Sequence, residues 1–167
     1  MDYEFAGLPL HVLVVHATIV AIPLVSVMLV VVGAWPAARR VLWIPVSLAA
    51  IALVPLVQLT VSAGEWLQAR VPATPLIQDH TTKGQGLMPW AIGLAVVGVA
   101  LAAWAIVELV SRRRGRTVGR GAVIAASAVL TVAAVVVGAG ATWNLIQIGE
   151  AGSRAVWEGS FSDEPLD

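Results

Sequence analysis

The stretch LHVLVVHATIVAIPLVSVMLVVVGA (Leu10–Ala34) is the clearest indication of the fold, because it contains no Asp, Glu, Lys or Arg. About 20 apolar residues are enough for a helix to cross the hydrocarbon core of a bilayer. Inside that core the backbone must form its own hydrogen bonds. A crossing segment is therefore helical even where β-branched runs such as 12–15 would favour a strand in water. The stretch predicts a membrane-spanning helix.

Three further apolar blocks follow the first and have similar lengths. The four predicted membrane helices are residues 10–34, 41–63, 87–110 and 121–143. The 167-residue chain is 59% hydrophobic and 12% charged, whereas a soluble domain is about half apolar and about a quarter charged. We predict an all-α fold, an integral membrane four-helix bundle of two hairpins within residues 1–152. Residues 153–167 are predicted to form an amphipathic, then acidic, loose tail.

The positive charges predict which way the helices point. Seven of the ten basic residues lie in the loops that join the first helix to the second and the third to the fourth: Arg39, Arg40, Arg112, Arg113, Arg114, Arg116 and Arg120. Cytoplasmic loops of membrane proteins are rich in Lys and Arg, so both loops are predicted to be cytoplasmic. Both chain termini are then extracytoplasmic, as are nine of the ten acidic residues, with Glu108 as the exception.

Composition excludes several kinds of chemistry. The chain contains no cysteine, which rules out disulfides and thiolate metal sites. Its net charge is zero, so nothing indicates a nucleic-acid partner. It has no Walker motif and no G-x-S-x-G motif, and we expect it not to be an enzyme by itself. Glu108 and Arg112 have the i, i+4 spacing of a helical ion pair.

All three histidines fall on the predicted extracytoplasmic side, His11 and His16 in the first helix and His80 before the third. Further polar residues share that level: Gln58, Glu65, Asp79, Asn144, Gln147 and Glu150. His11 and His16 are five residues apart, which places them about 140° apart around a helix and on different faces. Because a polar group deep in lipid is costly to leave unpaired, we expect His16 to point into the bundle and His11 to be more exposed.

Four interpretations of these histidines are open. In the first, His16 and His80, with His11 as a further candidate, ligate a b-type haem inside the bundle. In the second, His11, His16, His80 and Glu150 bind a zinc or copper ion. In the third, a histidine–carboxylate cluster carries protons. In the fourth, the histidines are structural, no cofactor is bound, and the chain is a non-catalytic accessory or assembly subunit.

The histidine segments resemble those of a bacterial family. GLPLHVLVVHAT (residues 7–18) resembles the Leu-His-Pro-x-x-Val-His-Phe-Pro opening of the four-helix membrane proteins filed as "domain of unknown function 2231", with the same spacing between its two histidines. IQDHTTKG (77–84) is similar to that family's histidine segment before its third helix. IGEAGSRAVWEG (148–159) is similar to its closing Gly-His-x-Gly segment, although Glu150 stands in place of the histidine.

The resemblance implies a multi-pass protein of the bacterial inner membrane. Family members occur fused to Rieske-type iron–sulfur domains, which implies a redox role. A membrane redox complex or a Rieske-type protein is then the expected partner, and haem b becomes equal in weight to the interpretation in which no cofactor is bound. Ligation by His16 and His80 agrees with this reading, whereas ligation of haem through Glu150 does not. The lipid bilayer is the predicted environment, and a homodimer is left open.

Overall fold

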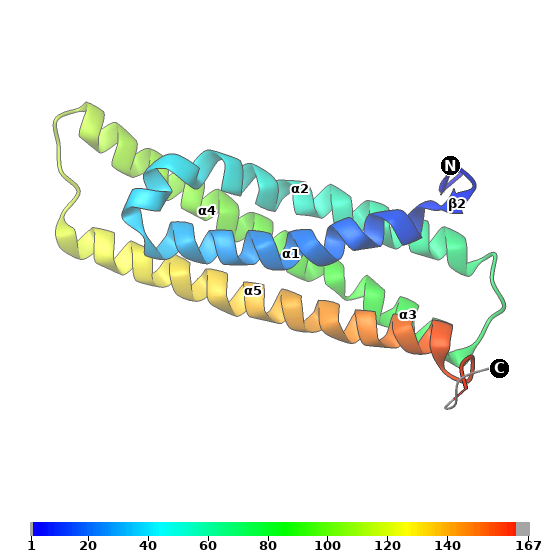
Figure 1. Ribbon diagram of the computed structural model, residues 1–167. Coiled ribbons are helices and arrows are strands. Elements are labelled where there is room, and N and C mark those ends of the chain that lie inside the picture. Colours follow the sequence, from blue (N-terminus) through cyan, green and yellow to red (C-terminus); the bar gives the residue numbers. More distant parts are fainter. Residues whose placement is uncertain (1, 163–167) are drawn as a thin grey trace.

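The computed structural model describes residues 2–162, and helices make up most of them (Figure 1). The elements within this range are β1 (Glu4–Phe5), β2 (Leu8–Pro9), α1 (Leu10–Ala34), α2 (Pro36–Gln68), α3 (Pro75–Gln85), α4 (Leu87–Arg113) and α5 (Arg120–Trp157). With α3 and α4 taken as one bent span, this part of the chain has 4 helical spans that are long and apolar enough to cross a membrane. The predicted all-α four-helix membrane bundle is confirmed, and the protein is a multi-pass membrane protein.

The helices are longer than most of the apolar blocks that predicted them. Only α1 begins and ends where the apolar block does. The last helix, α5, continues from the predicted end at residue 143 to Trp157, so residues 153–157 of the predicted loose tail are helical. A separate helix, α3, lies in the segment predicted as a loop. Hydropathy reports only the part of a helix that lies in lipid. Residues 163–167 of the predicted tail lie outside the described residues.

The four spans form a closed ring in the order α1, α2, α4, α5, and each packs against its two neighbours (Figure 1). Leucines and isoleucines such as Ile22 and Leu94 are fully buried between them. Two of the glycines allow neighbouring helices to approach closely. A Cβ on Gly98 of α4 would lie 2.8 Å from Ala50 Cβ on α2, and one on Gly138 of α5 would lie 2.8 Å from Ser26 Cβ on α1. Small residues therefore set the helix spacing, as is common in membrane bundles.

A bend at Gly86 separates α3 from α4. The Gly86 N–H donates to Lys83 O at 3.0 Å, which closes a tight turn. Pro89, near the start of α4, has no N–H to donate to the preceding turn. Because of this bend, α3 leaves the line of α4 and packs mainly on α5. The start of α3 is fixed by Thr74, whose Oγ1 accepts a hydrogen bond from Ile77 N at 3.2 Å.

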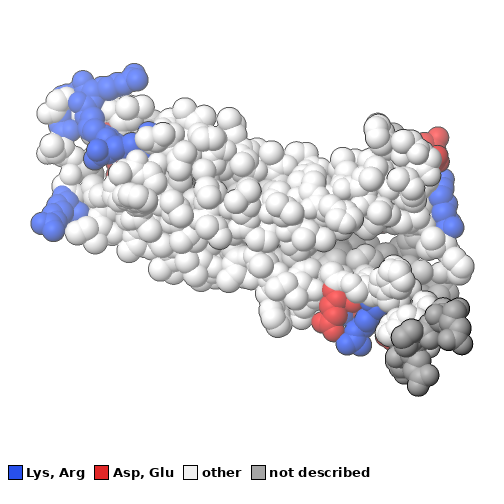
Figure 2. Space-filling model, in the orientation of Figure 1, with Lys and Arg blue, Asp and Glu red and all other residues white. Residues whose placement is uncertain are grey.

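The charged side chains gather at the two ends of the bundle and leave an apolar band between them (Figure 2). Valines in this band are largely exposed, for example Val96 at 62% and Val129 at 68%. A continuous apolar surface of this size requires lipid rather than water around it. We call the end with the α1–α2 turn and the α4–α5 loop the arginine end. The opposite end, which holds the histidines and both ends of the described chain, is the histidine end (Figures 1 and 2).

The arginine end contains a buried ion pair. Arg39, near the start of α2, is 0% exposed, and its Nη2 lies 3.0 Å from Glu108 Oε1 on α4. Its Nε donates to Glu108 Oε2 at 3.3 Å, and Trp104 Nε1 donates to Glu108 Oε1 at 3.1 Å. The predicted Glu108–Arg112 pair is also present, with Nη2 at 3.6 Å from Oε2. The closer partner of Glu108 is nevertheless Arg39, a residue that the charge pattern placed only in a loop.

Arg39 also contacts the other two helices. Its Nη1 donates to the carbonyls of Val32 at 3.0 Å and Gly33 at 2.8 Å. These carbonyls belong to the last turn of α1, where no partner exists within the helix. Its Nη2 donates to Ser127 Oγ on α5 at 3.1 Å. One guanidinium therefore joins α1, α2, α4 and α5.

Candidate functional site

His11, in the first turn of α1, faces the bundle. Its Nδ1 lies 2.9 Å from the carbonyl oxygen of Thr60 on α2. A carbonyl can only accept a hydrogen bond, so this contact assigns the proton to Nδ1 and leaves a lone pair on Nε2. The ring is half-buried. The prediction that His11 is the more exposed of the two histidines in α1 is wrong.

His80, on α3, repeats this arrangement with a different partner helix. Its Nδ1 lies 3.0 Å from the carbonyl oxygen of Ile148 on α5. The same reasoning places its proton on Nδ1 and a free lone pair on Nε2. Within residues 2–162, neither Nε2 atom has a hydrogen-bond partner.

The two rings lie close together although they come from different hairpins. The ring centroids of His11 and His80 are 6.3 Å apart, and the ring planes are inclined by 76°. One ring is anchored to α2 and the other to α5, so each hairpin of the bundle contributes one imidazole with its own main-chain acceptor.

Each ring lies over a glycine of its anchoring helix. A Cβ on Gly64 would lie 3.0 Å from His11 Nδ1, and one on Gly152 would lie 2.9 Å from His80 Cε1. Both glycines are four residues after the accepting carbonyl, so carbonyl and glycine lie on one face of the helix, one turn apart. The sequence signal is a shared pattern in TVSAG (60–64) and IGEAG (148–152), where Ala-Gly follows the accepting residue at the same distance.

A cavity of about 500 Å³ opens beside the two rings. Its mainly apolar walls come from α1, α2, α3, the start of α4 and α5, and include Val12, Val15, Ile19, Val61, Leu87, Leu145 and Ile148. The polar residues Thr18, Thr60, Glu65 and Gln85 also reach it. Its volume is typical of small-molecule and cofactor pockets, which are about 300–1,000 Å³. The surface is hollowed at this end of the molecule (Figure 2).

Two threonines hydrogen-bond to each other at the cavity wall. Thr18 Oγ1 on α1 and Thr60 Oγ1 on α2 are 2.8 Å apart. Thr60 Oγ1 also donates to Leu56 O at 2.8 Å. These hydroxyls are therefore already paired, whereas within residues 2–162 the Nε2 atoms of His11 and His80 are not.

His16 takes no part in this pair. It is exposed, and its Nδ1 lies 2.7 Å from Val12 O in its own helix. His11 and His16 lie on different faces of α1, as predicted, but the prediction that His16 points into the bundle is wrong. His11 faces the bundle because α2 places a carbonyl, Thr60 O, and a glycine, Gly64, opposite its ring.

Most of the other predicted polar residues lie away from the rings. Glu150 and Asp79 are exposed and form pairs within their own helices, with Arg154 at 2.8 Å and with Lys83 at 2.6 Å. In the described residues no group of three or more His, Cys, Asp or Glu side chains could hold a metal ion. The structure therefore does not bring His11, His16, His80 and Glu150 together.

The remaining predicted polar residues have local roles. Gln58 is exposed and donates to Ser62 Oγ at 3.1 Å, and Gln147 is exposed. Glu65 reaches the cavity and accepts from Gln85 Nε2 at 3.4 Å. Asn144 has a buried Oδ1 with no partner among the described residues.

Comparison with protein-family models, curated proteins and solved structures gave no match to this chain. The geometry of the ring pair and its cavity therefore carries the functional argument.

Proposed function

We propose that His11 and His80 would hold a b-type haem, and that the protein is a haem-binding membrane protein with a redox role. The distance between the rings carries this proposal. A metal–nitrogen bond is about 2 Å and Nε2 lies roughly 1 Å from the centre of its ring, so two imidazoles on opposite sides of one metal ion have centroids about 6 Å apart. The centroids of His11 and His80 are 6.3 Å apart.

Both rings are held in the way that metal-binding imidazoles usually are. A ligating histidine normally donates its other N–H to a carbonyl or carboxylate, which fixes the tautomer and the orientation of the ring. Thr60 O and Ile148 O accept that hydrogen bond. Both Nε2 lone pairs are thus available to a metal ion without a change of tautomer.

The cavity favours haem over a bare zinc or copper ion. A zinc site takes three or four protein ligands, and in residues 2–162 no third histidine or acidic side chain completes such a set. A haem brings its own nitrogen ligands, occupies apolar space and leaves only axial positions to the protein. When bound, it supplies one-electron transfer. The role of the chain is to present two oriented imidazoles and to keep water from the apolar walls. Gly64 and Gly152, which we call the glycine notches, leave room for the two rings.

The proposed cellular setting rests on charge and on the resemblance of the histidine segments. Under the positive-inside rule the arginine end faces the cytoplasm and the cavity lies near the extracytoplasmic face. The similarity of residues 7–18 to the opening of the "domain of unknown function 2231" proteins supports a bacterial inner membrane. It also supports a membrane redox complex or a Rieske-type protein as partner. In this chain the first histidine of that segment, His11, takes the role assigned to His16 from sequence.

The test is an absorption spectrum of the protein purified in detergent from a haem-replete host. We expect a Soret band in the parent that is lost in His11→Ala and in His80→Ala. His16→Ala is the matched control and should keep the band, because His16 is on the same helix but bonds to its own backbone. A colourless parent, or equal loss of the band in all three variants, contradicts the proposal.

The hydrogen bonds of the two rings favour one alternative, a non-catalytic accessory subunit in which the imidazoles only join helices. His11 links α1 to α2, and His80 links α3 to α5. In that case the purified parent is colourless and free of metal. Each of the two alanine variants would then lower the free energy of unfolding by about 1 kcal/mol. Metal analysis and thermal unfolding of the same samples distinguish the two functions.

A further inference from the structure

We propose that the arginine end contains a binding site for the headgroup of an anionic phospholipid. The site is a cavity of about 200 Å³ between the start of α2, the end of α4, the loop 114–119 and the start of α5. Arg40, Arg112 and Thr117 line it together with the apolar residues Val118 and Val123. This inference is independent of the haem proposal, because it concerns the opposite end of the bundle.

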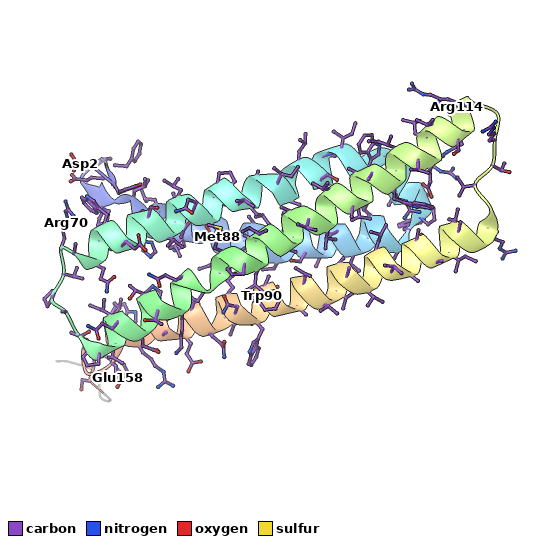
Figure 3. All side chains as sticks on the ribbon, turned by 180° about the vertical axis from the view of Figure 1, so that it is seen from behind. Asp2, Arg70, Met88, Trp90, Arg114 and Glu158 are labelled. Carbon is purple, nitrogen blue, oxygen red and sulfur yellow. The ribbon has the colours of Figure 1, made fainter. Side chains whose placement is uncertain are left out.

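The cavity lies at the level where phospholipid headgroups lie. The apolar band of the surface ends here, and the basic side chains begin (Figure 2). Arg114, just beyond α4, marks the far end of the molecule (Figure 3). Pockets of basic residues between membrane helices at this level are typical sites for acidic lipid headgroups.

Positive charge in the cavity exceeds the available negative charge. Glu108 also lines the cavity, but its carboxylate is already paired with the buried Arg39 at 3.0 Å. Arg112 makes a longer contact with the same carboxylate at 3.6 Å. Arg40 is exposed and has no hydrogen-bond or ion-pair partner within residues 2–162. The Nε of Arg112 also donates to the main-chain oxygen of Glu108 at 3.1 Å. A phosphate in the cavity would supply acceptor oxygens to Arg40 and to the remaining N–H groups of Arg112, and guanidinium groups bind phosphate well.

The apolar part of the lining favours a lipid over a free anion. Val118 and Val123 offer no hydrogen bond to an inorganic phosphate, but they can contact the glycerol and the first methylene groups of a phospholipid. The occupant that fits both parts of the lining is a phosphate attached to apolar carbon, presented from the membrane.

The test compares two double variants that remove the same charge. Binding of phosphatidylglycerol to the detergent-purified full chain is measured by native mass spectrometry, with phosphatidylcholine of the same acyl chains as reference. We expect Arg40→Gln/Arg112→Gln to weaken phosphatidylglycerol binding about tenfold to thirtyfold. Arg113→Gln/Arg114→Gln, which alters neighbouring residues that do not line the cavity, should weaken it about threefold or less.

A single variant guards against a general loss of structure. Arg40 has no partner in the described protein, so Arg40→Gln leaves the Glu108 contacts intact and should weaken binding about threefold to tenfold. Three results would overturn the proposal: equal losses in the two double variants, equal binding of phosphatidylcholine and phosphatidylglycerol, or displacement of the lipid by millimolar inorganic phosphate. The last result would assign the cavity to a free anion.

Discussion

The two ends of the bundle both use polar side chains to join helices, but they use their hydrogen-bonding groups differently. At the arginine end, every N–H direction of the Arg39 guanidinium has an acceptor on α1, α4 or α5. At the histidine end, His11 and His80 each use one nitrogen and leave the other beside a cavity of about 500 Å³. A buried side chain whose hydrogen-bonding groups are all paired stabilises the fold. A side chain that keeps an unpaired nitrogen beside a cavity is available to a ligand.

Burial gives the same contrast. The Arg39 side chain is 0% exposed and that of Glu108 is 8% exposed. Each buried charge is therefore stabilised by the opposite charge of its partner and not by water. The rings at the histidine end are only half-buried, and their main-chain hydrogen bonds orient them without using their full capacity. Polar groups that membrane helices place out of reach of water are usually paired or functional. Within residues 2–162 the arginine cluster is fully paired, and the two histidines at the opposite end each keep one unpaired nitrogen.

Removal of Arg39 should have the largest effect on the stability of the protein. Arg39→Ala leaves Glu108 buried without its closest partner, so we expect the free energy of unfolding to fall by about 3–5 kcal/mol. Thermal or denaturant unfolding in detergent measures this loss. Arg40→Ala is the adjacent control, and because Arg40 has no partner it should change stability by less than about 0.5 kcal/mol. Similar stabilities of the two variants would mean that the arginine end is not held by its ion pair.

Substitutions at Gly64 and Gly152 test how the two rings at the histidine end are positioned. In Gly64→Ala or Gly152→Ala the new methyl group would meet an imidazole at about the 3.0 Å and 2.9 Å distances of an added Cβ. We expect haem affinity to fall about tenfold, as is usual when the groups that orient a ligand are disturbed. Haem titration followed at the Soret band measures it.

Two glycines serve as matched controls for the notch variants. Gly84 and Gly149 also line the cavity, but a Cβ on either has no atom within 4 Å. Gly84→Ala and Gly149→Ala should therefore retain haem affinity within about twofold. If all four alanine variants lose affinity equally, the notches are not what positions the rings.

The smallest expected effect is at the threonine pair of the cavity wall. Thr18→Val keeps the shape of the side chain but removes the 2.8 Å contact with Thr60, which still donates to Leu56 O. We expect a loss of about 0.5–1 kcal/mol in the free energy of unfolding, with haem binding unchanged. Thermal unfolding and the Soret band of the same sample give both values. Loss of the band would show that this wall contributes more than packing.

Hydropathy predicted the membrane helices well because lipid imposes one simple requirement on a chain. The block 10–34 coincides with α1, and each of the other three blocks lies inside a longer helix. What hydropathy missed is outside the apolar band: α3 and the part of α5 after residue 143. The start of α3 is capped by Thr74, and α3 packs against α5 beyond the bend at Gly86. Neither feature requires a long apolar run in the sequence.

The sequence predicts a site with His16 and His80, whereas in the structure His11 is the histidine of α1 that lies beside His80. Depth in the membrane favours His16 over His11 as the inward-facing residue. The depth of a residue in the membrane is fixed by its position in the helix. The direction of its side chain depends on how the helix is rotated against its neighbours. Arg39 was missed for a similar reason, since a loop arginine and a buried arginine look alike until the approach of α4 places Glu108 beside it.

Composition alone predicts that four apolar segments cross a membrane as helices, with arginines at one end and histidines at the other. These properties follow from the composition of each segment and from the cost of exposing backbone or charge to lipid. Only the tertiary structure decided which imidazoles meet, because that depends on helix rotation and on carbonyls and glycines contributed by other segments. Only the tertiary structure, too, distinguished an arginine that is fully paired from histidines that keep a lone pair free.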